Sequence, residues 1–240
     1  MENVKRICLW SGPRNISTAL MYSFAQRNDT KVYDEPLYGY YLANTDAKEY
    51  HPGANDILRT MELDGLKVLE MMMGPQDKPV IFYKNMTHHL LDLPKAFMKD
   101  VVNVILTRDP LEMITSFAKV IKNPKMSDVG YEDHIKLLNY LDSIKAKSII
   151  LDSIKVLVDP KNTIDRLCKE IGIPFSDTML SWTAGARTED GIWAEYWYRN
   201  VHTSTGFMAY KPKNEGIPNH LTSLLKESQK HYKELIERSL

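Results

Sequence analysis

A short run near the start of the chain combines the groups that bind phosphate. An apolar stretch over residues 4–10 runs into Gly12-Pro13-Arg14-Asn15-Ile16-Ser17-Thr18. At a strand-to-helix turn, such a run supplies free backbone N–H groups, the positive end of a helix and short hydroxyl side chains. Arg14 adds a planar fork of donors. The run therefore predicts a loop that holds phosphate at the N-terminus of a helix beginning at Ser17.

This loop differs from the common ATP and GTP loop. The pattern G-x-x-x-x-G-K-[ST] has Gly-Lys before the hydroxyl residue. Here Asn15 and Ile16 precede Ser17, which disfavours an ordinary ATP or GTP site. Gly-Pro turns and Ser-Thr helix caps are also common structural features, so the phosphate interpretation needs support from a second site.

A second basic residue ends another expected strand. Arg108 follows an apolar run over residues 101–106, and Ser116 lies eight residues beyond Arg108. The pair Asp109-Pro110 predicts a helix start, because Asp caps free N–H groups and Pro at the first helical position gives up no hydrogen bond. Arg108 and Ser116 can therefore face one crevice. The structural alternative is an ion pair for Arg108 and a packing role for Ser116.

Both sites resemble motifs of the sulfotransferases. Residues 13–18 resemble their 5′-phosphosulfate loop, typically P-[KR]-S-G-[ST]-T, and residues 104–116 resemble their 3′-phosphate motif, with Arg at the strand end and Ser eight positions later. The resemblance implies 3′-phosphoadenosine 5′-phosphosulfate (PAPS) as a co-substrate, with no metal. The residues implied to bind it are Pro13, Arg14, Asn15, Ile16, Ser17, Thr18, Arg108 and Ser116.

The resemblance spans most of the chain. Residues 150–174 are similar to the strand, turn and helix ending in L-G-I-P of bacterial sulfotransferases. Residues 34–38 and 190–193 resemble a subgroup labelled branched-chain aminotransferase-like, because its plant members carry a fused aminotransferase domain. The sequence offers no basis for pyridoxal chemistry. The C-terminal R-K-G motif of the family survives only around Arg199 and Gly206.

Sulfuryl transfer in line between two oxygens needs charge stabilisation and a general base, and Arg14 is the implied partner of the leaving oxygen. Glu35 follows the second expected strand, 21 residues after Arg14, and resembles the catalytic glutamate of protein-tyrosine and some bacterial sulfotransferases. His88 or His89 is the alternative base, because Lys84 and its successors resemble the Lys-Thr-His segment of cytosolic sulfotransferases. The structural alternatives are an N-cap or a Lys84 ion pair for Glu35, and a helix start or surface position for the histidines.

We favour Glu35 over His88 as the base, because its place at a strand end puts it beside the phosphate loop. The basic loop is expected to keep Glu35 ionised. A carboxylate base would then leave the low-pH limb of the rate profile well below ~6.5, the reference pKa of histidine. A histidine base would put that limb nearer neutrality.

The elements that must position these residues alternate between strands and helices. Strands are expected at residues 4–10, 31–33, 80–83, 101–106 and 148–151. Helices are expected at residues 17–26, 57–73, 110–122, 131–145, 163–171 and 221–240. This order predicts one α/β domain over residues 1–240, a three-layer αβα sandwich with a central parallel sheet. The resemblance implies the P-loop NTPase-like sulfotransferase fold.

Residues 183–218 have little periodicity and are expected to form a loop over the site. Aromatic residues there and after the second strand are candidates for lining a pocket for a small apolar or aromatic alcohol. They are Tyr38, Tyr40, Tyr41, Trp193, Trp197 and Tyr198.

Composition limits the classes of partner. Lys and Arg together number 31, as do Asp and Glu, and this balance argues against a nucleic-acid partner. Cys8 and Cys168 have no metal-binding spacing and are expected to be buried thiols. No apolar run approaches the ~20 residues that cross a membrane, and the charged N-terminus is unlike a signal peptide. A cytoplasmic protein without a membrane partner is expected; the sequence carries no signal for an oligomeric state.

The leading hypothesis is a PAPS-dependent sulfotransferase that moves a sulfuryl group to a hydroxyl or amine of a small molecule. One alternative is a non-catalytic module that binds adenosine 3′,5′-bisphosphate, favoured by Asn15-Ile16 where the family usually has Ser-Gly. The other is a P-loop kinase-like phosphotransferase, opposed by the missing lysine and by the lack of a clear Mg²⁺-binding Asp after an apolar strand.

Overall fold

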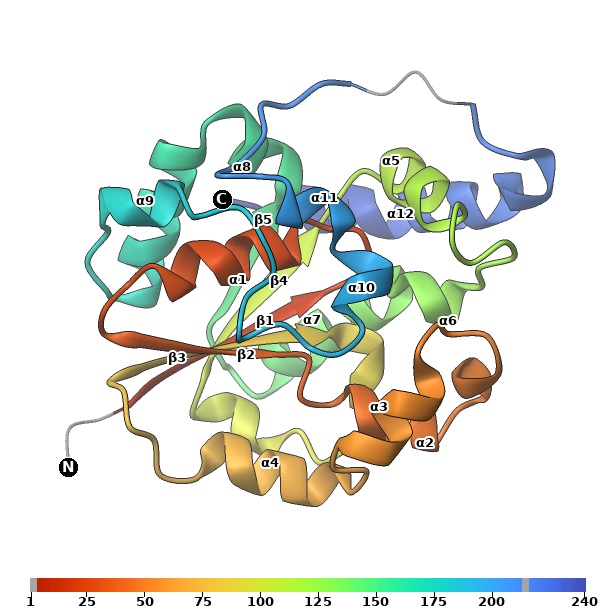
Figure 1. The fold of residues 1–240 in the computed structure, drawn as a ribbon. Helices are drawn as coiled ribbons and strands as arrows, with labels where there is room; N and C mark the ends of the chain where they lie inside the picture. Colours follow the sequence, from red (N-terminus) through yellow and green to blue (C-terminus); the bar gives the residue numbers. More distant parts are fainter. Residues whose placement is uncertain (1–3, 213–215) are drawn as a thin grey trace.

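A five-stranded parallel sheet forms the centre of the computed structural model, which describes residues 4–212 and 216–240. The strands are β1 (Lys5–Ser11), β2 (Thr30–Asp34), β3 (Val80–Met86), β4 (Val102–Thr107) and β5 (Ser148–Asp152). They lie in the order β2-β3-β1-β4-β5 (Figure 1). The chain therefore crosses from one side of β1 to the other between β3 and β4. In doubly wound sheets, ligands bind beyond the carboxyl ends of the strands at such a reversal.

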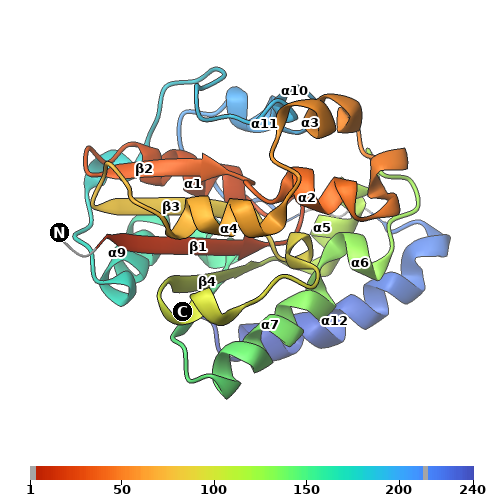
Figure 2. The same ribbon diagram turned by 90° about the horizontal axis from the view of Figure 1, so that it is seen from below.

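Both faces of the sheet are apolar and covered by helices (Figures 1 and 2). Ile7 and Leu9 of β1 point to one face, and Cys8 and Trp10 point to the other, because side chains alternate along a strand. The first face packs against α1 (Ser17–Ala25), α8 (Ser153–Val158) and α9 (Pro160–Ile171). The second packs against α4 (Gly65–Met73), α7 (Tyr131–Ser143) and α12 (Thr222–Ile236). The predicted three-layer αβα sandwich is confirmed.

The helix expected over residues 57–73 is wrong, because two helices occupy this stretch. They are α3 (Ala54–Thr60) and α4 (Gly65–Met73). Met61 is extended, and the side chain of Asp64 accepts a hydrogen bond from the backbone N–H of Leu66 at 2.9 Å. An Asp cap of this kind starts a new helix rather than continuing an old one. The helix expected over residues 110–122 also ends early, with α5 covering Pro110–Phe117.

Short helices surround the carboxyl ends of the strands. They are α2 (Tyr38–Ala43), α6 (Met126–Val129), α10 (Ala194–Trp197) and α11 (Arg199–His202). The last two belong to the segment expected to be a loop, and Figure 1 shows them over the sheet beyond α1. Cys8 and Cys168 are buried free thiols, as predicted. Within the described ranges, no helix is long and apolar enough to span a bilayer.

The start of α5 offers a test of the predicted cap. Asp109 accepts hydrogen bonds from the backbone N–H groups of Leu111 at 2.9 Å and Glu112 at 3.2 Å, and Pro110 begins the helix. Replacing Asp109 with Ala is expected to lower the free energy of unfolding by about 1 kcal/mol in urea denaturation, because these N–H groups lose their acceptor. Asp109→Asn, which caps equally well, should retain the stability. Equal losses in the two variants would show that the cap is not responsible.

Candidate active site

All the residues that the sequence predicts for catalysis or for binding the co-substrate line one cavity of about 400 Å³. The phosphate loop follows β1, Glu35 follows β2, His88 follows β3 and Arg108 follows β4. Four parallel strands therefore deliver the candidate groups to one edge of the sheet. Residues 193–211 of the C-terminal segment also contribute to the lining, so the expected cover over the site is present.

The phosphate loop keeps an unusual backbone without the glycine of the family motif. Ile16 has φ 56° and ψ 12°, a left-handed conformation that a β-branched residue rarely adopts. Two contacts hold it: Asn15 Nδ2 donates to the carbonyl oxygen of Leu106 at 2.7 Å, and Ile16 packs against the core beneath α1. Strained backbone of this kind persists only where surrounding contacts fix it, and it clusters at functional sites. The helix begins at Ser17, as predicted.

Two guanidinium groups lie together at the end of the cavity beside this loop. Arg14 Nε donates to Ser116 Oγ at 3.2 Å, and Arg14 also donates to the carbonyl oxygen of Trp197 at 3.0 Å. Arg108 donates to the carbonyl oxygen of Arg14 at 2.8 Å and pairs with Glu112 at 2.8 Å. Burial and the charge of Arg108 both lower the pKa of Arg14. Arg108 thus makes the ion pair of the structural alternative and lines the cavity as well.

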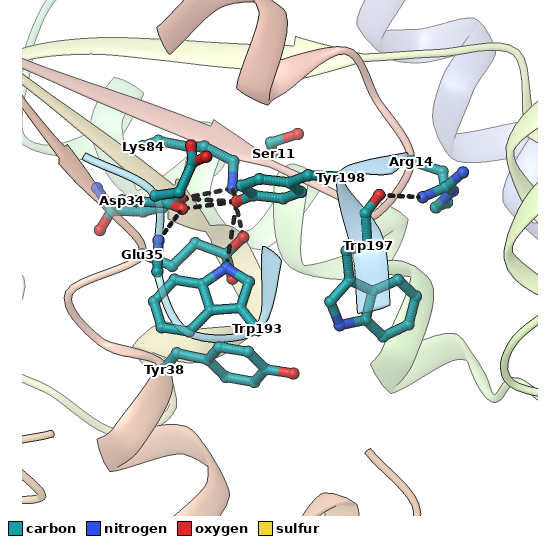
Figure 3. Close-up of polar contacts among 12 residues, drawn as sticks. Ser11, Arg14, Asp34, Glu35, Tyr38, Lys84, Trp193, Trp197 and Tyr198 are labelled. Carbon is teal, nitrogen blue, oxygen red and sulfur yellow. Dashed lines mark hydrogen bonds and ion pairs between the residues drawn. The ribbon is translucent and has the colours of Figure 1, made fainter. Parts of the chain in front are cut away.

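Glu35 lies in a buried charge cluster around Lys84, which is 1% exposed. The Lys84 ammonium donates to Asp34 at 2.8 Å, to Tyr198 Oη at 2.6 Å and to the Glu35 carboxylate (Figure 3). Trp193 Nε1 donates to Tyr198 Oη at 3.1 Å, and the Tyr198 hydroxyl donates to Asp34 at 2.7 Å. An ammonium has three N–H donors, so this cluster uses all of them.

The expectation that Glu35 has an ordinary carboxylate pKa is wrong. Burial raises the pKa of Glu35 to about 7, because Lys84 offsets only part of the loss of water and Asp34 adds repulsion. Burial alone would lower the pKa of Lys84, but the charges of Asp34 and Glu35 raise it. The cation near Glu35 is a lysine shared with Asp34, whereas the guanidinium groups of Arg14 and Arg108 have other partners. Raised carboxyl pKa values are typical of functional sites.

The histidines are buried, so the surface alternative for them is wrong. His88 and His89 lie on a 3₁₀ turn over Thr87–Leu90 and are 8% and 1% exposed. Burial lowers the pKa of His88 to about 3, helped by repulsion from His51 and His134. Burial also lowers the pKa of His89 well below its usual value. The sequence led us to expect a lower pH limb of the rate profile for a Glu35 base than for a histidine base. The structure reverses this order, because a Glu35 base gives a low-pH limb near 7 and a His88 base gives one near 3.

Aromatic residues line the cavity on two sides, with Trp197 beside Arg14 and with Tyr38 and Trp193 near Glu35. The lining includes Tyr38, Trp193, Trp197 and Tyr198, as predicted, whereas Tyr40 and Tyr41 are not among the lining residues. The rings of Tyr38 and Trp193 meet edge to face at 5.1 Å. Figure 3 shows these two rings together, with Trp197 across from them.

Sequence reasoning missed the role of Asp34 and Tyr198 at this site. A signal was present, because Lys84 lies in β3, whose residues are all buried. A buried lysine needs carboxylate partners, and Asp34 ends the neighbouring strand in register with Lys84, with Glu35 next to it in the chain. Tyr198 comes from the aperiodic C-terminal segment, which nothing in the local sequence connects to β2. Across the described part of the chain, no group of three or more His, Cys, Asp and Glu residues could hold a metal ion.

Comparison with known proteins identifies the family. The profile of the sulfotransferase domain matches residues 5–238. The chain belongs to the sulfotransferase family. Two Arabidopsis thaliana relatives of this sulfotransferase-family chain are named branched-chain-amino-acid aminotransferase-like proteins 2 and 1. They are 37% identical over 211 and 233 residues, which cover 87% and 96% of the chain but 37% and 40% of those proteins. The chain thus spans less than half the length of these relatives.

Solved sulfotransferase structures share the fold at low sequence identity. A domain from the curacin biosynthetic pathway has a TM-score of 0.60 at 17% identity and covers 98% of the chain and 99% of its own. A domain from the Synechococcus PCC 7002 olefin synthase has a TM-score of 0.53 at 13% identity, with 95% of each chain covered. A sulfotransferase from Alicyclobacillus acidocaldarius has a TM-score of 0.53 at 11% identity and covers 97% of this chain and 96% of its own.

The raised pKa of Glu35 predicts a pH-dependent stability. The pKa of Glu35 is about 7 in the folded protein and has its usual value of 4.5 in the unfolded chain, so between these pH values only the folded protein keeps the proton. The resulting stabilisation is fully present below the unfolded pKa and is lost as the pH rises through the folded pKa. Relative to Glu35→Gln, which cannot titrate, the wild type should lose on the order of 3 kcal/mol between about pH 4 and pH 8. Urea denaturation of both proteins at several pH values measures the difference in their free energies of unfolding. A difference that does not change with pH would contradict the prediction.

Proposed function

We propose that this chain transfers a sulfuryl group from PAPS to a hydroxyl or amine of a small molecule. The observation that carries the proposal is the meeting of three groups in one cavity: the phosphate loop, the Arg108/Ser116 pair and Glu35. Each comes from a different strand end, and each resembles a sulfotransferase motif, although Asn15-Ile16 replaces the usual Ser-Gly of the phosphate loop. In-line transfer needs a donor held in a fixed position and a base beside the hydroxyl or amine of the acceptor.

At the donor end, the chain offers two phosphate sites. The 5′-phosphate would meet the free N–H groups at the start of α1 and the hydroxyls of Ser17 and Thr18. The 3′-phosphate would meet Arg108 and Ser116. Arg14 reaches Ser116 and lies beside Arg108, so its guanidinium is close to both sites. Two adjacent cations repel each other, and bound phosphate would relieve this repulsion.

At the reacting centre, Glu35 would act as the general base. The sulfur–oxygen bond to the 5′-phosphate breaks as a bond from sulfur to the acceptor oxygen or nitrogen forms. The Glu35 carboxylate takes the acceptor proton, and the leaving phosphate keeps the electron pair, with Arg14 stabilising its charge. The products are adenosine 3′,5′-bisphosphate and the sulfated acceptor. Lys84 and Tyr198 act as positioning residues, because they hold the Glu35 carboxylate and its neighbour Asp34.

The charge cluster favours catalysis over passive nucleotide binding. Nucleotide binding alone does not require a buried carboxylate beside the phosphate loop, whereas proton transfer uses a group with a pKa raised to about 7. A general base is most effective when its pKa lies near the working pH, and a pKa of about 7 suits a base that works at neutral pH. A cytoplasmic location and the absence of nucleic-acid partners remain predictions from composition.

Arg108 tests the donor end. Arg108→Ala is expected to weaken the binding of adenosine 3′,5′-bisphosphate by about 1.5–3 kcal/mol more than it weakens the binding of AMP, because only the bisphosphate loses a charge-assisted contact. Calorimetry of both ligands measures the difference. Arg166→Ala, at an exposed position of α9, is the matched control. Equal weakening of both ligands would remove Arg108 from the 3′-phosphate site.

Glu35 tests the chemical step. Glu35→Gln should lower kcat by about 10²–10⁴-fold with adenosine 3′,5′-bisphosphate binding retained, because only proton transfer is lost. The low-pH limb of the wild-type profile should lie near 7. Single-turnover assays with PAPS measure both effects. The control Glu195→Gln changes an exposed carboxyl of α10 and should be active, and His88→Asn should have only a mild effect. An active Glu35→Gln with an inactive His88→Asn would assign the base to the histidine.

A further inference from the structure

A buried carboxylate lines the cavity without a cation to balance it. Asp128 on α6 is 3% exposed. It accepts hydrogen bonds from the Tyr50 hydroxyl at 2.8 Å and from the backbone N–H of Lys125 at 2.6 Å. The Lys125 ammonium pairs instead with Asp46, and no ion pair joins Asp128 to any basic side chain within residues 4–212 and 216–240. A buried carboxylate without a counter-charge is costly, so its retention needs a reason.

The fold holds this carboxylate close to the phosphate loop. A Cβ added at Gly12 would lie 2.7 Å from the carbonyl oxygen of Val129, so α6 packs directly against the residue that opens the loop. The capping contact with Lys125 accounts for one oxygen of Asp128 but needs no negative charge, because a neutral Gln serves as well as Glu at this third position of a capping box.

Aromatic and imidazole rings lie between Asp128 and Glu35. Tyr50, which bonds to Asp128, has its ring 5.2 Å from that of His51, and His51 Nδ1 lies 2.8 Å from Tyr38 Oη. The His51 and Trp197 rings are 6.3 Å apart. His51 does not balance Asp128, because burial lowers the pKa of His51 to about 4 despite the carboxylate. The charge of Asp128 therefore lies near the uncharged rings of Tyr38, His51 and Trp197.

The cavity is electrically divided. Arg14 and Arg108 are at the donor end, where phosphates would neutralise them, and Lys211 of the lining is exposed to solvent. On the acceptor side, the ammonium of Lys84 is already held by Asp34 and Glu35, which leaves Asp128 unbalanced. Aromatic faces attract cations, most strongly when both are removed from water. A ligand with a positive nitrogen would meet both the rings and the carboxylate, whereas an anionic ligand would be repelled.

We infer that the acceptor is a small amino alcohol, with its hydroxyl at Glu35 and its cationic nitrogen between the aromatic rings and Asp128. The inference rests on the proposed function and adds the substrate class. It replaces the apolar or aromatic alcohol expected from the sequence, because the lining contains a carboxylate as well as rings. The transfer itself is unchanged: the hydroxyl proton passes to Glu35, and the product carries a sulfate ester and a positive nitrogen.

A pair of probes that differ in one atom tests the charge preference. Choline and 3,3-dimethylbutan-1-ol have nearly the same shape, but only choline is cationic. Calorimetry on the protein saturated with adenosine 3′,5′-bisphosphate should show choline binding about 10-fold tighter or more. Equal affinity, or tighter binding of the neutral alcohol, would overturn the inference. Failure of the bisphosphate itself to bind would instead count against the proposed function.

Variants assign the preference to Asp128. Asp128→Asn keeps the shape of the side chain and removes its charge. It should weaken the binding of choline about 10-fold and leave the affinity for the neutral alcohol unchanged. Asp133→Asn is the matched control, since it removes a nearby half-buried carboxyl that is not among the residues lining this cavity, and it should change neither affinity. Unchanged bisphosphate binding verifies that each variant is folded. A preference that survives in Asp128→Asn would overturn the role of Asp128.

Discussion

The buried pairing of Lys84 with Asp34 and Glu35 is the constraint on which the site depends. It connects the carboxyl ends of β2 and β3 and, through Tyr198, the C-terminal segment. Removing one partner of such a cluster leaves an unbalanced charge away from water, which is more destabilising than losing the whole cluster. The sequence is therefore tightly restricted here for electrostatic reasons, and the chemistry uses a carboxyl group whose properties this restriction sets.

The phosphate loop shows a second way of holding a reactive geometry. A glycine would reach the left-handed conformation at position 16 without strain, but this chain uses an isoleucine anchored in the core. The neighbouring Asn15 ties the loop to the end of β4 by a side-chain hydrogen bond. Backbone shape is thus obtained from packing and hydrogen bonding instead of conformational freedom. A rigid loop has less entropy to lose when an anion binds.

Local signals in the sequence were sufficient for much of the fold. The positions of the strands, the helix start at Ser17 and the cap at Asp109 depend on neighbouring residues, and all were predicted. The break between α3 and α4 was missed, because the apolar period continues across it. The pKa of Glu35 and the burial of His88 could not be predicted, because both depend on residues that tertiary packing brings together. The roles of the site residues stay predictions.

The link between Tyr198 and Asp34 couples the cover of the cavity to its proton chemistry. Tyr198 belongs to the segment that closes over the site, and Trp193 of that segment also bonds to the Tyr198 hydroxyl. If this segment lifted to let product leave, water would reach Glu35, and the desolvation that raises its pKa would be lost. A proton taken from the acceptor would then pass to bulk water. Departure of the product and resetting of the base for the next turnover would be one event.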